Sequence, residues 1–191
     1  MLAAQSMFLF ALPQSPERDV RRAFEATYEA SRGDVYRWSL RFSGGRSGWA
    51  EDITHDVFLR LFEHLPRLDD TQDLGGWLYR VTANLALSRL RRDRSLAARV
   101  GRFFTEESED QAEDGPDAGL ALKEDAKAAL AALRALPPRE SVVLTMKVID
   151  GKSQREIADA LGMSEGYVSK LVTRGWQLIR EAGWEVADAE A

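Results

Sequence analysis

Apolar residues recur at helical spacing through most of this chain, and the two-residue alternation typical of strands is nearly absent. The strongest example covers residues 50–65, which we expect to form a helix ended by Pro66. Residues 18–40 are expected to form one helix or a broken pair. Further helices are expected over residues 77–94, 120–135, 139–149, 153–161 and 165–181, with breaks rich in glycine or proline between several of them. The pattern predicts an all-α fold.

Residues 153–174 have the pattern of two helices separated by a tight turn. Ser153 and Glu156 match the S-x-x-E capping box that starts a helix, and Gly162 suits the left-handed conformation that ends one. Ser164 is placed to cap a second helix, whose polar residues form what we call the reading face. The reading face comprises Glu165, Tyr167, Ser169, Lys170, Thr173 and Arg174.

This pattern is typical of a helix-turn-helix, in which the second helix enters the major groove of DNA. We therefore expect Ser164 and the reading face to contact DNA. The alternative is an ordinary pair of packed helices without a nucleic-acid role.

The segment from residue 102 to 119 loses apolar periodicity and becomes acidic, which is typical of a flexible tether. Each helical part beside it is small enough to have a marginal core, so each should gain from a partner. We expect an N-terminal tail at 1–16, two small helical domains at 17–100 and 123–182 joined by a flexible acidic linker at 101–122, and a C-terminal tail at 183–191.

Within the first 16 residues, positions 2–12 are apolar enough to resemble a short signal core, but no lysine or arginine precedes them. No clean small-x-small cleavage site follows, so we expect a loose tail, or a mis-set start codon with Met7 as the other candidate, rather than a signal peptide. No run approaches the roughly 20 apolar residues that a membrane span requires, and the lack of cysteine fits a reducing compartment. We expect a cytoplasmic protein without membrane insertion.

The net charge of −5 is unusual for a protein that binds nucleic acid, but the charge is unevenly distributed. Residues 77–102 contain seven arginines and one aspartate, and residues 126–181 contain nine bases and six acids. Residues 103–125 contain nine acids and one lysine. The acidic segment therefore masks two basic ones, and both are suited to a phosphate backbone.

A polar stripe follows the helix expected from Trp77, beside its apolar seam. Arginines neutralise phosphates, an aromatic ring can stack on an unpaired base, and an amide can read a base edge. The stripe suits nucleic acid on these grounds; the alternative is a solvated face whose last arginines complement the helix dipole. The polar stripe comprises Trp77, Arg80, Asn84, Ser88, Arg91 and Arg92.

Three acids, Glu51, Asp52 and Asp56, lie in the first two turns of the helix expected over residues 50–65. They complement the helix dipole, or they belong to a protein-docking face to which Phe58 or Phe62 adds exposed apolar surface. The chemistry of these residues supports the two interpretations equally.

Motifs for catalysis are missing from the chain. It has no phosphate-binding G-x-x-x-x-G-K-[ST] loop, no G-x-S-x-G elbow and no H-E-x-x-H zinc motif. Its two histidines, His55 and His64, are not spaced to share one face of their expected helix. We therefore expect no enzyme activity, no metal and no cofactor.

Four blocks in this order resemble the extracytoplasmic-function sigma factors of the sigma-70 family. They are AEDITHDVFLRL at residues 50–61, WLYRVTANLAL at 77–87, LPPRE at 136–140 and the helix-turn-helix. The resemblance covers roughly residues 20–182. It implies two helical domains, regions 2 and 4, joined by a linker.

By this resemblance the chain would bind core RNA polymerase, direct it to specific promoters and help to melt them. The helix over residues 50–65 would grip the clamp helices of the largest subunit, which favours docking by Glu51, Asp52, Asp56 and Phe58. The polar stripe would hold the non-template strand of the −10 element. The second domain would read the −35 element and touch the polymerase flap, and the acidic linker would run through the active-site channel.

The chain departs from the family pattern in the reading helix, where Tyr167 replaces a usual threonine and Leu171 a frequent arginine. Base reading would then depend on Glu165, Tyr167, Lys170 and Arg174. Members of this family are often held inactive by an anti-sigma factor, so the resemblance implies that class of partner too. The alternative function is a free-standing helix-turn-helix regulator, which would bind duplex DNA tightly without polymerase.

Overall fold

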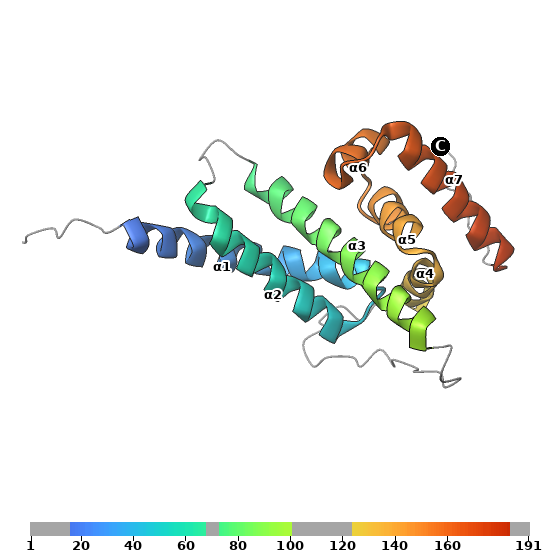
Figure 1. The fold of residues 1–191 in the computed structure, drawn as a ribbon, viewed down its shortest axis with the longest axis horizontal. Coiled ribbons are helices and arrows are strands. Elements are labelled where there is room, and N and C mark those ends of the chain that lie inside the picture. The colour runs from blue at the N-terminus through green and yellow to red at the C-terminus, as the bar shows by residue number, and fades with distance from the viewer. Residues whose placement is uncertain (1–15, 68–72, 101–123, 184–191) are drawn as a thin grey trace, which may run out of the picture.

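The computed structural model describes residues 16–67, 73–100 and 124–183, and these ranges contain helices and turns but no strand, which confirms the all-α prediction (Figure 1). The acidic linker and nearly all of both tails lie outside them. No helix in the described ranges has the length and apolar character needed to cross a membrane. The elements are α1 (Pro16–Phe42), α2 (Ser47–His64), η1 (Leu65–Arg67), α3 (Leu74–Val100), α4 (Glu124–Ala135), α5 (Pro138–Leu144), η2 (Thr145–Ile149), α6 (Gln154–Leu161) and α7 (Glu165–Glu181).

Helices α1, α2 and α3, with η1, form an N-terminal unit. The glycine-rich break between α1 and α2 lies where the sequence predicts it, and Gly44 and Gly45 there have φ angles of 68° and 91°. Residues with side chains would be strained in that left-handed region. The predicted inward face of α2 is buried, with Ile53, Val57 and Leu61 at most 1% exposed.

Helix α3 is longer at both ends than the expected 77–94. Its earlier start has a local cause, because the side-chain Oδ1 of Asp73 accepts a hydrogen bond of 3.0 Å from the backbone N–H of Gly76. The backbone oxygen of Asp73 also accepts from the N–H of Trp77 at 2.9 Å. The cap therefore places Trp77 in the first turn of α3.

Helices α4 to α7 form a C-terminal unit, and α6 and α7 have the predicted bounds to within one residue. Ser153 Oγ accepts from the backbone N–H of Glu156 at 3.2 Å, and Glu156 Oε2 accepts from the N–H of Ser153 at 2.9 Å. Gly162 has a φ of 62°, and Ser164 Oγ accepts from the N–H of Tyr167 at 3.3 Å. The predicted capping box, helix stop and second cap are all confirmed.

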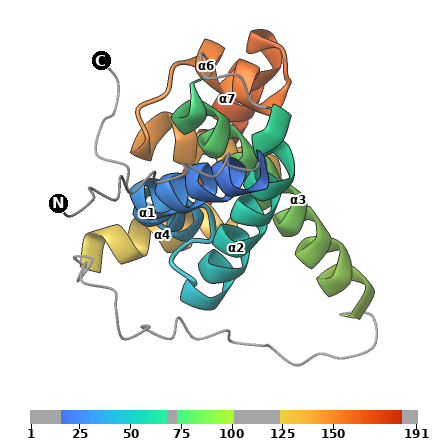
Figure 2. The same ribbon diagram turned by 90° about the vertical axis from the view of Figure 1, so that its left-hand side faces the viewer.

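The two units pack against each other. Helix α3 lies between α1 and α2 on one side and α5 and α6 on the other, and Figure 2 shows α6 and α7 stacked above α1. One continuous apolar cluster includes Leu78 and Ala83 of α3 together with Val142, Met146 and Ile157 of the C-terminal unit. The sequence predicted two domains on a tether; it did not predict that they share a core.

Candidate nucleic-acid interface

The reading face of α7 lies on the surface of the C-terminal unit. Its glutamate, tyrosine, lysine, threonine and arginine are exposed and Ser169 is half-buried, while Val168, Leu171 and Ile179 on the opposite side are buried. The 5% exposure of Leu171 explains why this position carries no arginine here, because the side chain packs in the core. The structure thus keeps the predicted reading residues on the accessible side of α7, whose other side packs in the core.

Helix α5 supports two members of the reading face from behind. Arg139 donates a hydrogen bond of 2.8 Å from its guanidinium to the hydroxyl of Tyr167, and its Cζ lies 5.6 Å from the centre of that ring. Arg174 Nε lies 3.5 Å from Glu140 Oε1, whose side chain is only 6% exposed. These contacts hold Tyr167 and Arg174 in place, whereas the ammonium group of Lys170 has no hydrogen bond or ion pair with another described residue.

The polar stripe also lies along one side of its helix, α3, but it is less open. Arg80, Ser88, Arg91 and Arg92 are exposed, and Trp77 and Asn84 are half-buried. The Trp77 ring lies 5.8 Å from the His64 ring, centre to centre.

Asn84 is the member of the stripe that the C-terminal unit covers. Its side-chain Nδ2 donates hydrogen bonds to the backbone oxygens of Arg80, at 2.8 Å, and of Ala160 in α6, at 2.9 Å. Both amide donors that could read a base are therefore occupied, one of them by the other unit.

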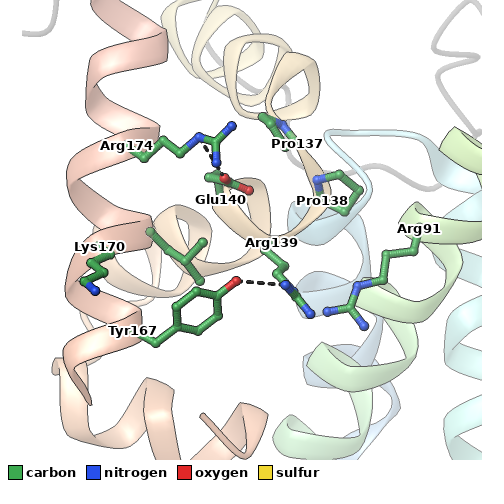
Figure 3. A pocket seen from close by; sticks show the side chains of 9 residues that line it. Arg91, Pro137, Pro138, Arg139, Glu140, Tyr167, Lys170 and Arg174 are labelled. Atoms are coloured by element: carbon green, nitrogen blue, oxygen red, sulfur yellow. Dashed lines mark hydrogen bonds and ion pairs between the residues drawn. The ribbon is translucent and has the colours of Figure 1, made fainter. Parts of the chain in front are cut away.

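A cavity of about 500 Å³ lies where α3 meets α5 and α7. Its basic side chains are Arg91 of the polar stripe, Arg139 of α5, and Lys170 and Arg174 of the reading face; Figure 3 shows Arg91 reaching from α3 toward Arg139. Glu140 is the acid in its lining. The cavity is therefore strongly cationic and suits phosphate groups.

The acids proposed for docking, Glu51, Asp52 and Asp56, are all exposed on α2. Asp52 Oδ2 lies 2.6 Å from the guanidinium of Arg89 in α3, and the Asp52 side chain is 60% exposed. This ion pair links α2 to α3 and leaves Glu51 and Asp56 open to a partner.

Phe58 does not provide the docking surface expected of it. Its side chain is 4% exposed because α1 covers it, and its ring lies 4.7 Å from that of Tyr28, centre to centre. The exposed apolar side chains of α2 are instead Phe62, at 54%, and Leu59, at 50%. The apolar stripe of α2 includes both Phe58 and Phe62. Only the position of α1 determines that Phe58 is buried and Phe62 is exposed.

A buried polar cluster that the sequence did not reveal joins the two units. Asp150, at the end of η2, has a side chain only 5% exposed, and its Oδ1 lies 2.5 Å from the guanidinium of Arg41 in α1. Its Oδ2 accepts a hydrogen bond of 2.6 Å from the hydroxyl of Tyr79 in α3. Burial, followed by this bond, raises the pKa of the Tyr79 hydroxyl, so it stays protonated and donates. We call Arg41, Tyr79 and Asp150 the latch.

Two family profiles match this chain. Sigma-70 region 2 matches residues 27–96, and Sigma-70, region 4 matches residues 126–178. The first range contains the polar stripe and the second contains the reading face. Together they cover more than half of the chain.

Curated relatives extend this similarity. The chain is 33% identical over 150 residues to the ECF RNA polymerase sigma factor SigE of Mycolicibacterium smegmatis, which covers 77% of this chain and 56% of that protein. It is 28% identical over 174 residues to the ECF RNA polymerase sigma factor BldN of Streptomyces coelicolor, covering 90% of this chain and 63% of that one. The chain thus spans less than two thirds of the length of either relative.

A solved structure has the same fold. The sigma factor RpoE from Bartonella quintana, in complex with the anti-sigma factor NepR, aligns with a TM-score of 0.57 over 84% of this chain and 96% of that chain. Sequence identity is 19%, so this likeness concerns the fold alone.

Proposed function

We propose that this chain, which belongs to the extracytoplasmic-function sigma factors of the sigma-70 family, binds core RNA polymerase and directs it to specific promoters. The observation that supports the proposal is a polar, basic side on one helix of each matched region, α3 in the first and α7 in the second, with chemistry that suits nucleic acid. We call the N-terminal unit region 2 and the C-terminal unit region 4 from here on.

Region 2 would dock on polymerase through the exposed side of α2. Glu51 and Asp56 supply charge there, and Leu59 and Phe62 supply apolar surface. Clusters of exposed apolar side chains rimmed by charge are typical of protein interfaces. This exposed side of α2 would contact the clamp helices of the largest polymerase subunit. Region 4 would contact the polymerase flap.

The polar stripe of α3 would capture the non-template strand of the −10 element. Melting costs about 1–2 kcal/mol per base-pair step in lost stacking. Each base held on an aromatic platform in a basic groove returns about 1–3 kcal/mol. A few captured bases can therefore offset opening, provided that polymerase holds region 2 in a fixed position.

The reading face of α7 would recognise the −35 element as duplex. Two weak DNA contacts on one chain gain strength once polymerase fixes their spacing, because the second contact then forms at a high effective concentration. The chain would act in the cytoplasm without catalysis of its own. An anti-sigma factor is a proposed partner, in line with the complex in which the similar Bartonella quintana protein was solved.

Run-off transcription with core polymerase, on promoters selected from random DNA, tests the function. The double substitution Arg80→Ala with Asn84→Ala should impair strand opening much more than polymerase binding. Arg32→Ala, an exposed arginine of α1, is the matched control and should leave both unchanged.

Two outcomes would contradict this function. Equal loss of opening and polymerase binding in the double variant would indicate a folding defect rather than a strand-capture role. Tight, specific duplex binding by the chain alone, with no response to polymerase, would favour the free-standing regulator.

A further inference from the structure

We propose that the cavity where α3 meets α5 and α7 binds a nucleoside diphosphate or triphosphate, with the phosphates on its basic residues and the nucleoside against Glu140 and Tyr167. Binding of this ligand does not depend on the proposed function. Its consequence for −35 recognition does, because part of the reading face lines the cavity. The cavity is distinct from the latch, none of whose residues lines it.

The cavity holds more positive charge than its own acid can balance. Of its bases, Arg174 pairs with Glu140, Nε to Oε1, at 3.5 Å. Arg91, Arg139 and Lys170 form no ion pair with a carboxylate in the described ranges. A nucleoside diphosphate carries about −3 at neutral pH, since its terminal phosphate adds about −1.5 to −2 to the single charge of the inner one. Its charge therefore matches the three unpaired bases.

An anion would relieve the repulsion among these bases. Like charges at short range repel one another more strongly near a protein than in open water. A cleft lined by one sign of charge also raises the local concentration of counter-ions. Figure 3 shows that the bases come from separate helices, with Arg91 on α3, Arg139 on α5, and Lys170 and Arg174 on α7. One ligand in the cavity would thus contact cations from all three.

The cavity suits a small molecule better than the backbone of a DNA duplex. Its volume of about 500 Å³ lies within the roughly 300–1,000 Å³ typical of small-molecule sites. Pro137, Pro138 and Leu171 add apolar surface to its lining. A duplex presents phosphates to a protein on its outside, whereas a ribose or a base can enter a cavity and cover its apolar walls.

Glu140 favours a nucleoside over inorganic phosphate alone. Its side chain is 6% exposed, and no donor in the described part of the chain forms a hydrogen bond with its carboxylate. Buried polar groups are ordinarily hydrogen-bonded. A ribose hydroxyl or a base amine can donate to this carboxylate, whereas an ionised phosphate would be repelled by it. The acid therefore selects the end of the ligand that carries donors.

Tyr167 offers an aromatic surface to the same end of the ligand. Its side chain is 37% exposed, and aromatic rings hold bases by stacking. The bond of 2.8 Å from Arg139 to its hydroxyl fixes the position of the ring. Arg139 would thus contact the phosphates with its guanidinium and place the ring that meets the base.

Occupancy of the cavity would block promoter reading. The ligand would contact Tyr167, Lys170 and Arg174, which line the cavity and belong to the reading face. The same side chains cannot bind a nucleotide and a base pair at once. Under the proposed function, the nucleotide would therefore compete with the −35 duplex.

Isothermal titration calorimetry of the full chain tests binding without polymerase or DNA. The probes are ATP, GTP, ADP and GDP, together with inorganic triphosphate as a source of phosphate alone, at about 150 mM salt. At least one nucleotide should bind with one-to-one stoichiometry and more tightly than inorganic triphosphate. AMP and GMP should bind about tenfold more weakly or less, because they offer fewer charges to the bases.

Arg139→Ala should weaken nucleotide binding about tenfold or more, because it removes a charged donor and releases the Tyr167 ring. Arg155→Ala, an exposed arginine of α6 outside the cavity lining, removes the same charge and is the matched control. Circular dichroism checks the helical content of both. If Arg139→Ala loses it, Lys170→Ala takes its place, because that side chain is exposed and should also weaken binding.

Glu140→Gln separates the nucleoside contact from the phosphate contacts. Loss of the negative charge favours every anion, so the informative quantity is the ratio of nucleotide affinity to inorganic triphosphate affinity. This ratio should fall about three- to tenfold, because a hydrogen bond to a carboxylate is about twice as strong as one to an amide. Both affinities are measured on the same variant, so a partial loss of folded protein cancels.

Competition is measured with the chain bound to core polymerase and a fluorescent duplex that carries the −35 element. Duplex binding is followed rather than transcription, because transcription itself requires nucleotides. The tightest nucleotide should displace the duplex, and the Arg139→Ala complex should need about tenfold more of it. Effects of the nucleotide on polymerase are the same in both complexes.

Three outcomes would overturn the proposal. They are no calorimetric binding of any nucleotide, equal binding of nucleotides and inorganic triphosphate, and an unchanged affinity ratio in Glu140→Gln. None of them would count against the proposed function, which needs no nucleotide in this cavity. Nucleotide binding by a chain that leaves core polymerase inactive on every promoter would contradict the proposed function and leave the site in place.

Discussion

The two helices proposed to meet DNA present their polar sides in different ways. Helix α7 exposes every residue of its reading face except the half-buried Ser169, and the supporting contacts from Arg139 and Glu140 come from within region 4. Helix α3 lies between α1 and α2 of its own region and α5 and α6 of region 4, and Asn84 in the middle of its polar stripe is bound by region 4. The surface proposed for duplex DNA is thus accessible in this structure, whereas the surface proposed for single strands is partly covered.

This difference matches the order of events that the proposed function requires. Duplex recognition comes first and needs only an exposed helix. Strand capture comes later, and the contact between Asn84 and Ala160 covers the middle of the polar stripe, which would weaken the binding of stray single strands. Under the proposed function, this cover would reduce nonspecific contact of nucleic acid with the polar stripe before polymerase is bound.

The largest expected effect tests whether the two regions share one core. Leu61→Ala in α2 should lower the free energy of unfolding by about 2–5 kcal/mol, because the side chain is fully buried. Leu59→Ala, on the same helix but 50% exposed, is the matched control and should change it by about 0.5 kcal/mol or less. Urea unfolding measures both.

Amide hydrogen exchange then shows which helices are destabilised in Leu61→Ala. In Leu61→Ala the amides of α7 should exchange faster along with those of α2, because the continuous cluster couples the regions. Unchanged exchange in α7 would show that regions 2 and 4 unfold independently, and the contrast between α3 and α7 would lose its basis in a shared core.

A smaller effect is expected when a proposed base-contacting residue is removed from the reading face of α7. Lys170→Ala should reduce discrimination between −35 sequences by about 1–3 kcal/mol. Lys170 is a better target than Arg174 for this test, because loss of Arg174 would also leave the buried Glu140 carboxylate without its ion-pair partner. Transcription from promoters with single −35 changes measures discrimination, and Lys147→Ala, an exposed lysine of η2, is the control. Equal discrimination by wild type and Lys170→Ala would remove this lysine from the reading set.

The features that the sequence predicted correctly are those that depend on residues close together in the chain. The capping box at Ser153 and Glu156, the stop at Gly162 and the cap at Ser164 depend on residues close together in the chain, so a local pattern was enough. Helix bounds elsewhere were less accurate; the predicted 139–149 helix is α5 followed by the π-helical η2.

Features that depend on distant residues were not predicted. Nothing in the periodicity of α2 shows that Tyr28 of α1 covers Phe58 and leaves Phe62 exposed. Asp150 follows a helix and looks like an ordinary polar end residue, yet it pairs with Arg41. The cover on Asn84 is of the same kind, since its acceptor belongs to the other region.

The smallest expected effect concerns the cap that makes α6 predictable. Hydrogen bonds from the backbone N–H of Ser153 and then from its hydroxyl lower the pKa of the Glu156 carboxyl below its ordinary value. A group whose folded pKa is lowered stabilises the fold above its unfolded pKa and loses that contribution as the pH falls through the folded pKa. The wild-type melting temperature should therefore decline slightly on acidification below about pH 4.5.

Glu156→Gln separates the charge of this cap from its geometry. The amide oxygen can still accept from Ser153, but it does not titrate, so the acid-dependent part of the decline should disappear while the helix bounds stay the same. Melting temperatures between about pH 3 and pH 6 measure this, with Asp159→Asn on the same helix as the control outside the cap. Identical acid profiles for wild type and Glu156→Gln would mean that the ionised carboxylate adds nothing to the cap. The start of α6 would then depend on Ser153 and the packing of Ile157, and even the most local feature of region 4 would be held by tertiary contacts, as α3 is.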